Sequence, residues 1–328
     1  MRRPRPRRTC APAPGDPTPS TAATGGLRLP YGVPVTTVDP EALAAAERDA
    51  DVAVARSQVQ VRTLHTHEEL AEARDLWDAV WPSPTGTEVT NNHLRAIEHS
   101  GGYVGGAFDG DVMVGACLAF VGRTRSHDPE LGWHTHLHSH MAAVLPQAAD
   151  RGIGTAIKLH QRAWALRHGM DRIVWTYDPL VRRNARLNLM KLGGIAVEYL
   201  VDFYGEMVDD LNKGEPSDRL LLQWDLGSVR VEGALAGTSA ALSSDDWLAV
   251  GAEQALVVDA RGPQVIEASA PVRLVALPHD IVAIRHDDAE LARRWRLDVR
   301  AVLEPLISQG GRVVALTTDG HYVVEVSA

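Results

Sequence analysis

Residues 138–169, HSHMAAVLPQAADRGIGTAIKLHQRAWALRHG, contain the pattern that decides the fold. An apolar strand runs into the triplet VLP, a polar turn with two glycines follows, and a helix then begins. Ile153, Ile157 and Trp164 recur at helical spacing on one side of this helix, and Gly169 ends it. A strand that leads into a helix through a short glycine turn is typical of the parallel part of an α/β sheet.

On the N-terminal side of this unit, the sequence predicts a short strand, a helix and a hairpin. The helix over 66–81 has Thr66 as N-cap and Glu69 three residues later, which is a capping box. The hairpin consists of two apolar strands separated by Asp109 and Gly110, a strong signal for a tight turn. Antiparallel strands therefore precede the strand that carries the histidines.

On the C-terminal side, strands are predicted over 171–179, 195–205 and 218–226, with a short helix over 182–194. This order of elements indicates a mixed α/β sheet flanked by helices, whose parallel portion surrounds the glycine turn. We assign residues 57–227 to this domain.

The two ends of the chain differ from this domain in character. Residues 1–56 are expected to be a disordered, basic and proline-rich tail with a leader of helical composition from residue 40. Residues 228–328 are expected to form a smaller α+β lobe. It would contain short strands, one clear helix over 287–311 and a closing hairpin around Asp319-Gly320.

Composition excludes several classes of function. The formal net charge is −9, which removes the phosphate attraction on which nucleic-acid binders depend. There is no apolar run of about 18 residues, so we expect no membrane association. Only Cys10 and Cys117 are present, which argues against a secreted disulfide framework and for a cytoplasmic protein.

The turn RGIG is a candidate anion site. Its successive backbone N–H groups and the start of the helix converge outside the sheet, and the two glycines allow a phosphate to approach the backbone closely. The turn is neither a Walker loop nor a three-glycine Rossmann fingerprint. A plain connection between strand and helix is the alternative interpretation.

The motifs taken together resemble the GNAT superfamily of acyl-CoA N-acyltransferases. The match comprises the VLP strand end, the RGIG turn with its helix, and a later segment with DPL, Asn184-Ala185 and KLG. A poorly characterised bacterial group of predicted GNAT acetyltransferases is the most similar. The similar segments are LHSHMAAVLP, RGIGTAIKLHQR, WTYDPL, NARLNLMKLG, FYGEM, PSDRLLLQW and RHDDAELARRWRLDVR, which run from about residue 60 to the end.

The resemblance implies an enzyme that transfers an acyl group, in the first place acetyl, from acetyl-CoA or another acyl-CoA to a primary amine. A small molecule, an amino acid among the options, would be the acceptor and would attack directly. The backbone of Ala142 and Val144 would pair with the pantetheine arm, and Asn184 would hold the cofactor from the next helix. The amides that would bind the pyrophosphate belong to Asp150, Arg151, Gly152, Ile153, Gly154 and Thr155.

Basic side chains near the turn have two interpretations. Arg151, Lys158 and Arg162 would add positive charge near the phosphates, or would simply be solvated on the helix surface.

The sequence departs from the family pattern at two positions. Ala149 stands where Gln or Arg is common, and Asp150 suits a phosphate site only if its side chain turns to solvent. Leu189 stands where many members have a tyrosine acid. Tyr199 and Tyr204 are candidates to replace that tyrosine, of which we choose Tyr204, although packing is the usual role of tyrosines on a sheet.

Four histidines at alternate positions, His134, His136, His138 and His140, are expected to share one face of a strand, with Leu137 and Met141 on the other. An amine must lose a proton before it can attack, and imidazole suits this task. By resemblance, the catalytic glutamate of related enzymes lies six positions before Val144, at His138. We therefore expect His138 to be the base or the head of a water relay, with His140 as second choice.

Other interpretations stay open. The histidine row could bind zinc in a hydrolase, with Asp128 or Glu130 as further ligands, although we expect no metal. The chain could instead be a catalytically silent acyl-CoA-binding regulatory module. Asp218-Arg219 and the run over 293–296 would clamp a carboxylate-bearing acceptor or form ion pairs between the lobes. A homodimer is an open alternative to a monomer.

Overall fold

The computed structural model describes residues 39–82, 89–125, 132–205 and 216–326, which all belong to one compact unit. Of the predicted tail and leader over 1–56, residues 1–38 lie outside these residues, as do the proposed metal ligands Asp128 and Glu130, while the leader from residue 40 is helical. The strands are β1 (Gln60–Thr63), β2 (Tyr103–Asp109), β3 (Val112–Arg125), β4 (Trp133–Val144), β5 (Arg172–Tyr177), β6 (Ile195–Leu200), β7 (Arg219–Asp225), β8 (Glu253–Asp259), β9 (Gly262–Val265), β10 (Val272–Ala276), β11 (Arg312–Leu316) and β12 (His321–Glu325).

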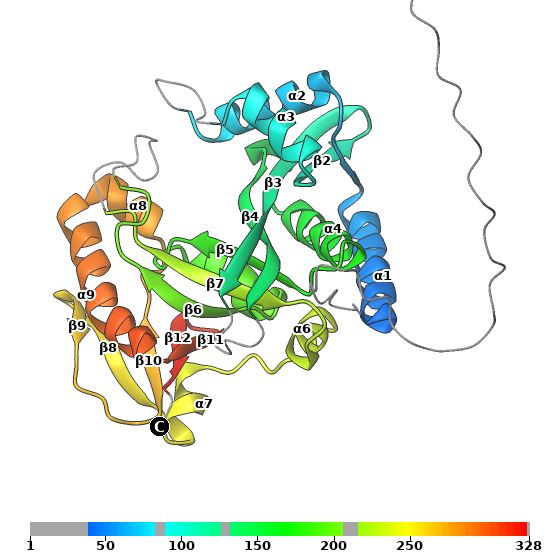
Figure 1. Ribbon diagram of the computed structural model, residues 1–328. Helices are drawn as coiled ribbons and strands as arrows, with labels where there is room; N and C mark the ends of the chain where they lie inside the picture. Colours follow the sequence, from blue (N-terminus) through cyan, green and yellow to red (C-terminus); the bar gives the residue numbers. More distant parts are fainter. Residues whose placement is uncertain (1–38, 83–88, 126–131, 206–215, 327–328) are drawn as a thin grey trace, which may run out of the picture. The chain divides into compact units, whose positions relative to one another are not determined.

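The described strands form one mixed sheet in the order β1-β2-β3-β4-β5-β7-β6-β11-β12-β10-β8-β9 (Figure 1). Most pairs are antiparallel, while β4 with β5 and β10 with β8 are parallel. The predicted mixed α/β class is therefore confirmed, with a parallel pair next to the glycine turn. The strands that follow residue 227 continue the same sheet through a contact between β6 and β11 at Ala196 and Val313. The boundary near residue 227 stays a prediction.

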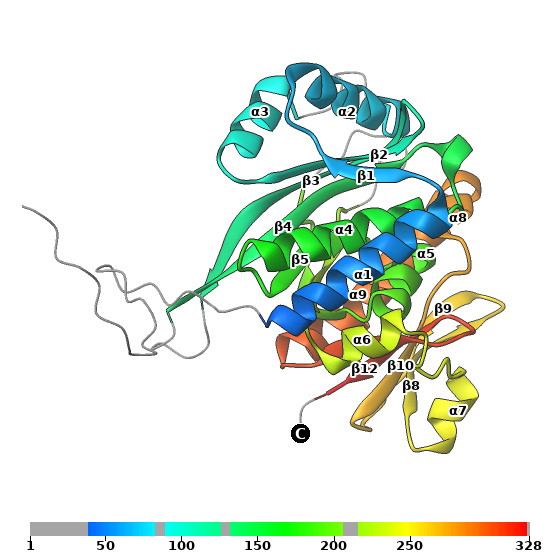
Figure 2. The same cartoon turned by 90° about the vertical axis from the view of Figure 1, so that its right-hand side faces the viewer.

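Helices cover both faces of this sheet. The longer ones are α1 (Pro40–Ser57), α2 (His67–Val80), α3 (Asn91–His99), α4 (Ile153–Arg167) and α9 (Ala289–Ser308). The shorter ones are α5 (Arg182–Ala185), α6 (Val229–Leu235), α7 (Ser244–Ala249), α8 (Ile281–Asp287), the 3₁₀ turn η2 (Pro146–Ala148) and the π-helical turn η3 (Arg186–Lys191). Figure 2 shows α1 and α4 side by side on one face, with α2 and α3 on the opposite side of β1 to β3. Helix α9 packs against β6 and β8 to β11.

Local signals in the sequence explain where several elements begin and turn. The Oγ1 of Thr66 accepts a hydrogen bond from the Glu69 amide, and the Glu69 carboxylate accepts one from the Thr66 amide, so the predicted capping box is confirmed. Gly110 has a φ of 59° in the turn between β2 and β3, as a tight hairpin requires. Helices α3, α6, α7 and α8 and strand β9 were not predicted from the sequence.

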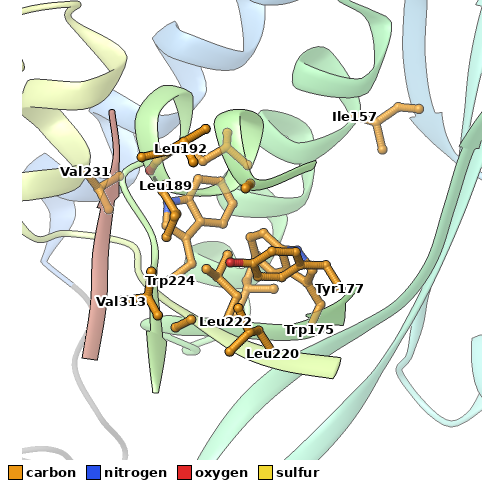
Figure 3. Close-up of a cluster of buried hydrophobic side chains, with 14 of the residues drawn as sticks. Ile157, Trp175, Tyr177, Leu189, Leu192, Leu220, Leu222, Trp224, Val231 and Val313 are labelled. Atoms are coloured by element: carbon orange, nitrogen blue, oxygen red, sulfur yellow. Dashed lines mark hydrogen bonds between the residues drawn. The ribbon is translucent and has the colours of Figure 1, made fainter. Parts of the chain in front are cut away.

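A cluster of large apolar side chains fills the centre of the unit, between β5, β6 and β7 and the segments that cover them (Figure 3). Trp224 and Leu222 are fully buried there, and the Trp224 indole donates to the Leu192 carbonyl at 2.7 Å. Leu189 is 1% exposed and belongs to this cluster. The position where a tyrosine acid would be expected is thus part of the apolar core.

Candidate active site

Strands β4 and β5 pair over only a short distance. Their partners are Leu137 with Ile173 and His138 with Val174, although β4 continues to Val144 and β5 to Tyr177. Past this point, within the described residues, β4 pairs only with β3 and β5 only with β7. Residues 139–144 of β4 and 175–177 of β5 therefore do not pair with each other, and we call these two stretches the fork. Backbone groups of β4 that face β5 are therefore available to another extended chain.

The glycine turn follows directly from the β4 side of the fork. Gly152 is the N-cap of α4 with a φ of 82°, and no side chain caps the helix. The amides of Ile153, Gly154 and Thr155 donate to no acceptor among the described residues. A Cβ at Gly152 or Gly154 would meet no atom within 4 Å, so the space above these amides is open. The geometry suits an anion, as the sequence predicts.

Asp150 and Arg151, the two charged residues of the turn, form ion pairs with different elements. The Asp150 side chain is 88% exposed and pairs with Arg183 at 3.2 Å, so it does turn to solvent. Arg151 pairs with Asp109 at 2.5 Å and also donates to the Ser57 carbonyl, which directs it toward the end of α1. The contact of Arg183 places α5 beside the turn. We did not single out Arg183 from the sequence, although it immediately precedes Asn184.

Asn184 lies exposed on α5, and in β4 Ala142 is exposed while Val144 is half-buried. The structure thus brings the predicted cofactor-binding residues to the fork, the turn and the helix beside the turn.

Two other predicted basic residues are not near the turn surface. Arg162 is fully buried, pairs with Asp49 of α1 at 2.6 Å and donates to the Leu226 carbonyl. Lys158 is also buried, and its Nζ lies 2.9 Å from the Ser139 Oγ. Both interpretations offered for these two side chains, phosphate contact and simple solvation, are wrong. Helix α4 is covered by the sheet on one side and by α1 on the other, so it has little solvated face.

The histidine strand does not alternate regularly along its whole length. Ser139 lies opposite Ala119 and Met141 opposite Leu118, which leaves His140 as the extra residue of a β-bulge. Met141 consequently packs in the apolar cluster of α2, on the face opposite to Leu137. The expectation that Met141 shares the face of Leu137 is wrong, because the bulge reverses the alternation.

His138 and His140 nevertheless share one face, as predicted. The His138 ring stacks on Phe120 at 4.9 Å between centroids, and the His140 ring lies 6.2 Å from His138 and 5.8 Å from Phe120. Burial, followed by the nearby positive charges of His140, His136 and Lys158, lowers the pKa of His138 to about 4. His138 is therefore a neutral imidazole at pH 7.

The other two histidines of the row have structural partners. The Nε2 of His134 lies 2.9 Å from an Asp171 carboxylate oxygen. His136 is 6% exposed, packs over the backbone of Gly122 and contacts Thr124 at 3.3 Å. His134 and His136 thus have polar partners, whereas the rings of His138 and His140 pack beside Phe120.

Tyr204 lies beside the fork, whereas the hydroxyl of Tyr199 binds the Asp218 carboxylate. The Tyr204 hydroxyl is 3.0 Å from the Oγ1 of Thr176, a fork residue, and its ring is 6.4 Å from the His140 ring. Tyr199 donates to the buried Asp218 carboxylate at 2.7 Å. Burial and this carboxylate raise the pKa of Tyr199 well above its usual range, so it is a structural group. The structure brings the three predicted catalytic residues, His138, His140 and Tyr204, together on one side of the fork.

Arginines of α8 and α9 form ion pairs with carboxylates that lie next to the ends of β5 and β7. Arg296 binds Asp178 through two hydrogen bonds of 2.8 Å, and Arg285 reaches the same carboxylate at 2.7 Å. Arg300 binds Asp218 through two bonds of 2.6 and 2.8 Å. Of the two interpretations of these charges, the structure therefore favours ion pairs over an acceptor clamp.

Among the described residues, no group of three or more His, Cys, Asp or Glu side chains could hold a metal ion. The zinc alternative also invoked Asp128 and Glu130, which are not described. No described helix is both long and apolar enough to cross a membrane.

Part of the chain matches a known protein family. Residues 66–193 match the acetyltransferase (GNAT) family. NAA60 of Arabidopsis thaliana, solved with acetyl-CoA, is 14% identical over 51% of this chain and 99% of its own, with a TM-score of 0.41. An N-acetyltransferase from Staphylococcus aureus Mu50 is 15% identical over 51% of this chain and 98% of its own, with a TM-score of 0.40. No curated protein is similar enough in sequence to match. The family match confirms the resemblance for residues 66–193.

Proposed function

We propose that this chain, whose residues 66–193 form a domain of the GNAT acetyltransferase family, transfers an acyl group from acyl-CoA to the primary amine of a small molecule. The proposal rests on one observation: the fork, the turn with its open amides, and the histidine pair occur together. An open amide turn follows the fork, and His138 and His140 lie together on the strand that leads to it. A proton-accepting group thus lies on the strand whose free backbone would hold the thioester.

The residues present fit acyl-CoA. The first-turn amides of α4 have no competing acceptor among the described residues, and Gly152 and Gly154 leave the space above them open. The backbone of Ala142 and Val144 would hold the pantetheine arm, and the amides over 150–155 would hold the pyrophosphate. Arg183 and Asn184 would approach from α5. When bound, acyl-CoA supplies a thioester carbonyl that an amine can attack.

His138 would accept the proton of the amine. Its neutral imidazole has a free lone pair at pH 7, but with a pKa of about 4 it does not retain a proton. It would therefore act as the head of a relay and pass the proton to water or to His140, which is exposed. The carbon–nitrogen bond forms, the carbon–sulfur bond breaks, and the Tyr204 hydroxyl beside the fork would protonate the leaving thiolate.

Release of free thiol tests the proposal. The wild type is mixed with acetyl-CoA or succinyl-CoA and with a panel of small amines, amino acids and peptides with free N-termini. His138→Gln should lower kcat by about 10²–10⁴-fold, because general-base catalysis contributes that much. The rise in Tm caused by acetyl-CoA should be unchanged in this variant, since His138 is not part of the phosphate site.

His134→Gln is the matched control, because His134 lies on the same strand but pairs with Asp171. It should keep the wild-type kcat. A rise in Tm without thiol release from any acceptor would contradict acyl transfer and would favour a silent binding module. If acyl-CoA changed neither Tm nor thiol release, the proposal would be wrong altogether. Activity restricted to peptides would refute the small-molecule acceptor.

A further inference from the structure

Lys158 lies at the point where β4 and β5 separate. Its Nζ is 2.9 Å from the Oγ of Ser139 and 3.8 Å from the centroid of the Trp175 ring. Ser139 and Trp175 are the first residues of the fork, because the last paired residues are His138 and Val174. One buried amine from α4 therefore contacts both strands where their pairing stops.

Among the described residues, the buried Lys158 amine has a hydroxyl and an aromatic ring as neighbours but no counter-ion. In the part of the chain that the structure describes, no carboxylate pairs with Lys158, and it interacts electrostatically with the Cys117 thiol and with His138. Burial lowers the pKa of Lys158 to about 7. A buried amine without a counter-ion makes a poor contribution to stability, and an apolar side chain of similar length would fill the same space at less cost.

The contacts of Lys158 lead to the bulge that carries the histidines. Ser139 donates its hydroxyl proton to the Oε1 of Gln161 at 3.0 Å, so its oxygen accepts from Lys158. Ser139 lies between His138 and His140, and the bulge begins directly after it. Two side chains of α4 thus fix the backbone between the two histidines.

We propose that Lys158 is a positioning residue of the acyl-transfer site: through Ser139 it fixes the β4 bulge at the start of the fork and thereby the placement of His138. This inference rests on the proposed function, since the placement of His138 matters only if His138 handles a proton. Lys158 itself is not a catalytic residue, because its contacts are with Ser139 and Trp175 behind the histidine face.

Lys158→Met tests the proposal, because methionine keeps the length of the side chain and removes the amine. Its kcat should fall by roughly 10- to 100-fold, as small misplacements of a reacting group do, while KM for acetyl-CoA changes little. Its Tm should be unchanged or higher. Tyr103→Phe is the matched control: it removes the buried polar contacts of the Tyr103 hydroxyl with His160 of α4 and with Cys117, but leaves the contacts of Lys158 with Ser139 and Trp175 in place. It should leave kcat unchanged.

A second readout needs neither acyl-CoA nor an acceptor. The titration of the His138 ring is followed by NMR in the wild type and both variants. Among the described residues, the titratable groups whose charges act on His138 are His136 and His140 on β4 and Lys158 on α4, and Phe120 of β3 stacks on its ring. Its titration midpoint should rise in Lys158→Met and stay unchanged in Tyr103→Phe, because only the former removes a positive neighbour.

The outcomes separate this inference from the proposed function. If no amine is acylated but the His138 titration moves in Lys158→Met alone, the contact is supported and the proposed function fails. Unchanged titration with unchanged kcat would overturn the positioning role. If Lys158→Met does not fold, Ser139→Ala removes the same contact from the other side and should lower kcat. Full activity in that variant would equally overturn the role.

Discussion

Asp178 is the residue whose substitution should most damage the fold. Its carboxylate lies directly after β5, is 7% exposed, and accepts from Arg296 twice and from Arg285 once. It also accepts from the amide of Leu180 at 2.9 Å. Burial acts to raise the pKa of Asp178, but Arg296 and Arg285 hold it well below its usual range. The carboxylate is therefore charged in the folded protein at any pH where the protein is handled.

Asp178→Asn keeps the shape of the side chain and removes the charge that two guanidinium groups share. Breaking a buried ion pair from one side costs about 3–5 kcal/mol, because the desolvated partner charge is left without compensation. That is a large part of the roughly 5–15 kcal/mol by which proteins of ordinary stability resist unfolding. At about 2–4 °C per kcal/mol, Tm should fall by about 6–20 °C.

Thermal and urea unfolding, followed by circular dichroism, would measure this loss. Asp259→Asn is the control, because Asp259 pairs with Arg261 on the surface and its loss should leave Tm nearly unchanged. A triple variant, Asp178→Leu with Arg285→Met and Arg296→Met, removes all three charges together and should recover most of the stability. A loss below about 1 kcal/mol in Asp178→Asn, or a triple variant no more stable than the single one, would refute the reasoning.

Two further predictions concern the turn and the histidine. Gly154→Val should fold, because a Cβ there meets no atom within 4 Å. Its side chain would cover the open amides and so reduce the rise in Tm caused by acetyl-CoA. An unchanged rise in Tm would exclude the turn as the phosphate site. The pKa of His138 is lowered from 6.5 to about 4 in the folded protein. Between pH 6.5 and 4 the unfolded chain therefore binds a proton on this imidazole that the folded protein does not bind. The free energy of unfolding should decrease as the pH falls through this range. The loss is at most about 3 kcal/mol, and Tm measured from pH 7 to 4 should show a shallower decline in His138→Gln than in the wild type.

The features that could be predicted from the sequence are local ones. The capping box of Thr66 and Glu69 and the turn at Gly110 each depend on residues within four positions, and both are present. The glycine turn is of the same kind, since the φ of Gly152 and the uncapped helix start follow from the chain between β4 and α4. A short-range pattern predicts such features because few other conformations satisfy it.

Features that depend on distant partners could not be predicted in this way. The bulge at His140 is defined by the register of β4 against Leu118 and Ala119, which lie some twenty positions earlier in the chain. Lys158 and Arg162 were expected near the phosphates or on a solvated helix face, but Lys158 packs against β4 and β5 and Arg162 pairs with Asp49 of α1. A single amphipathic stripe does not predict burial on both sides of a helix, because the second covering element is not encoded in the helix itself.

The ion pairs of the C-terminal segment connect that segment to the candidate site. Asp178 follows Tyr177, the last residue of the fork, and its partner Arg296 lies 118 positions later on α9. Asp218 precedes β7, which pairs with β5 along the fork, and it binds Arg300 of the same helix.

The β5 side of the fork is thus held from α9, whereas the β4 side is held from α4 through Lys158 and Ser139. Because β4 and β5 do not pair beyond His138 and Val174, their spacing depends on what holds each strand from outside. Residues beyond 227 therefore contribute to the geometry of the site without supplying any of the groups that we assign to the chemistry.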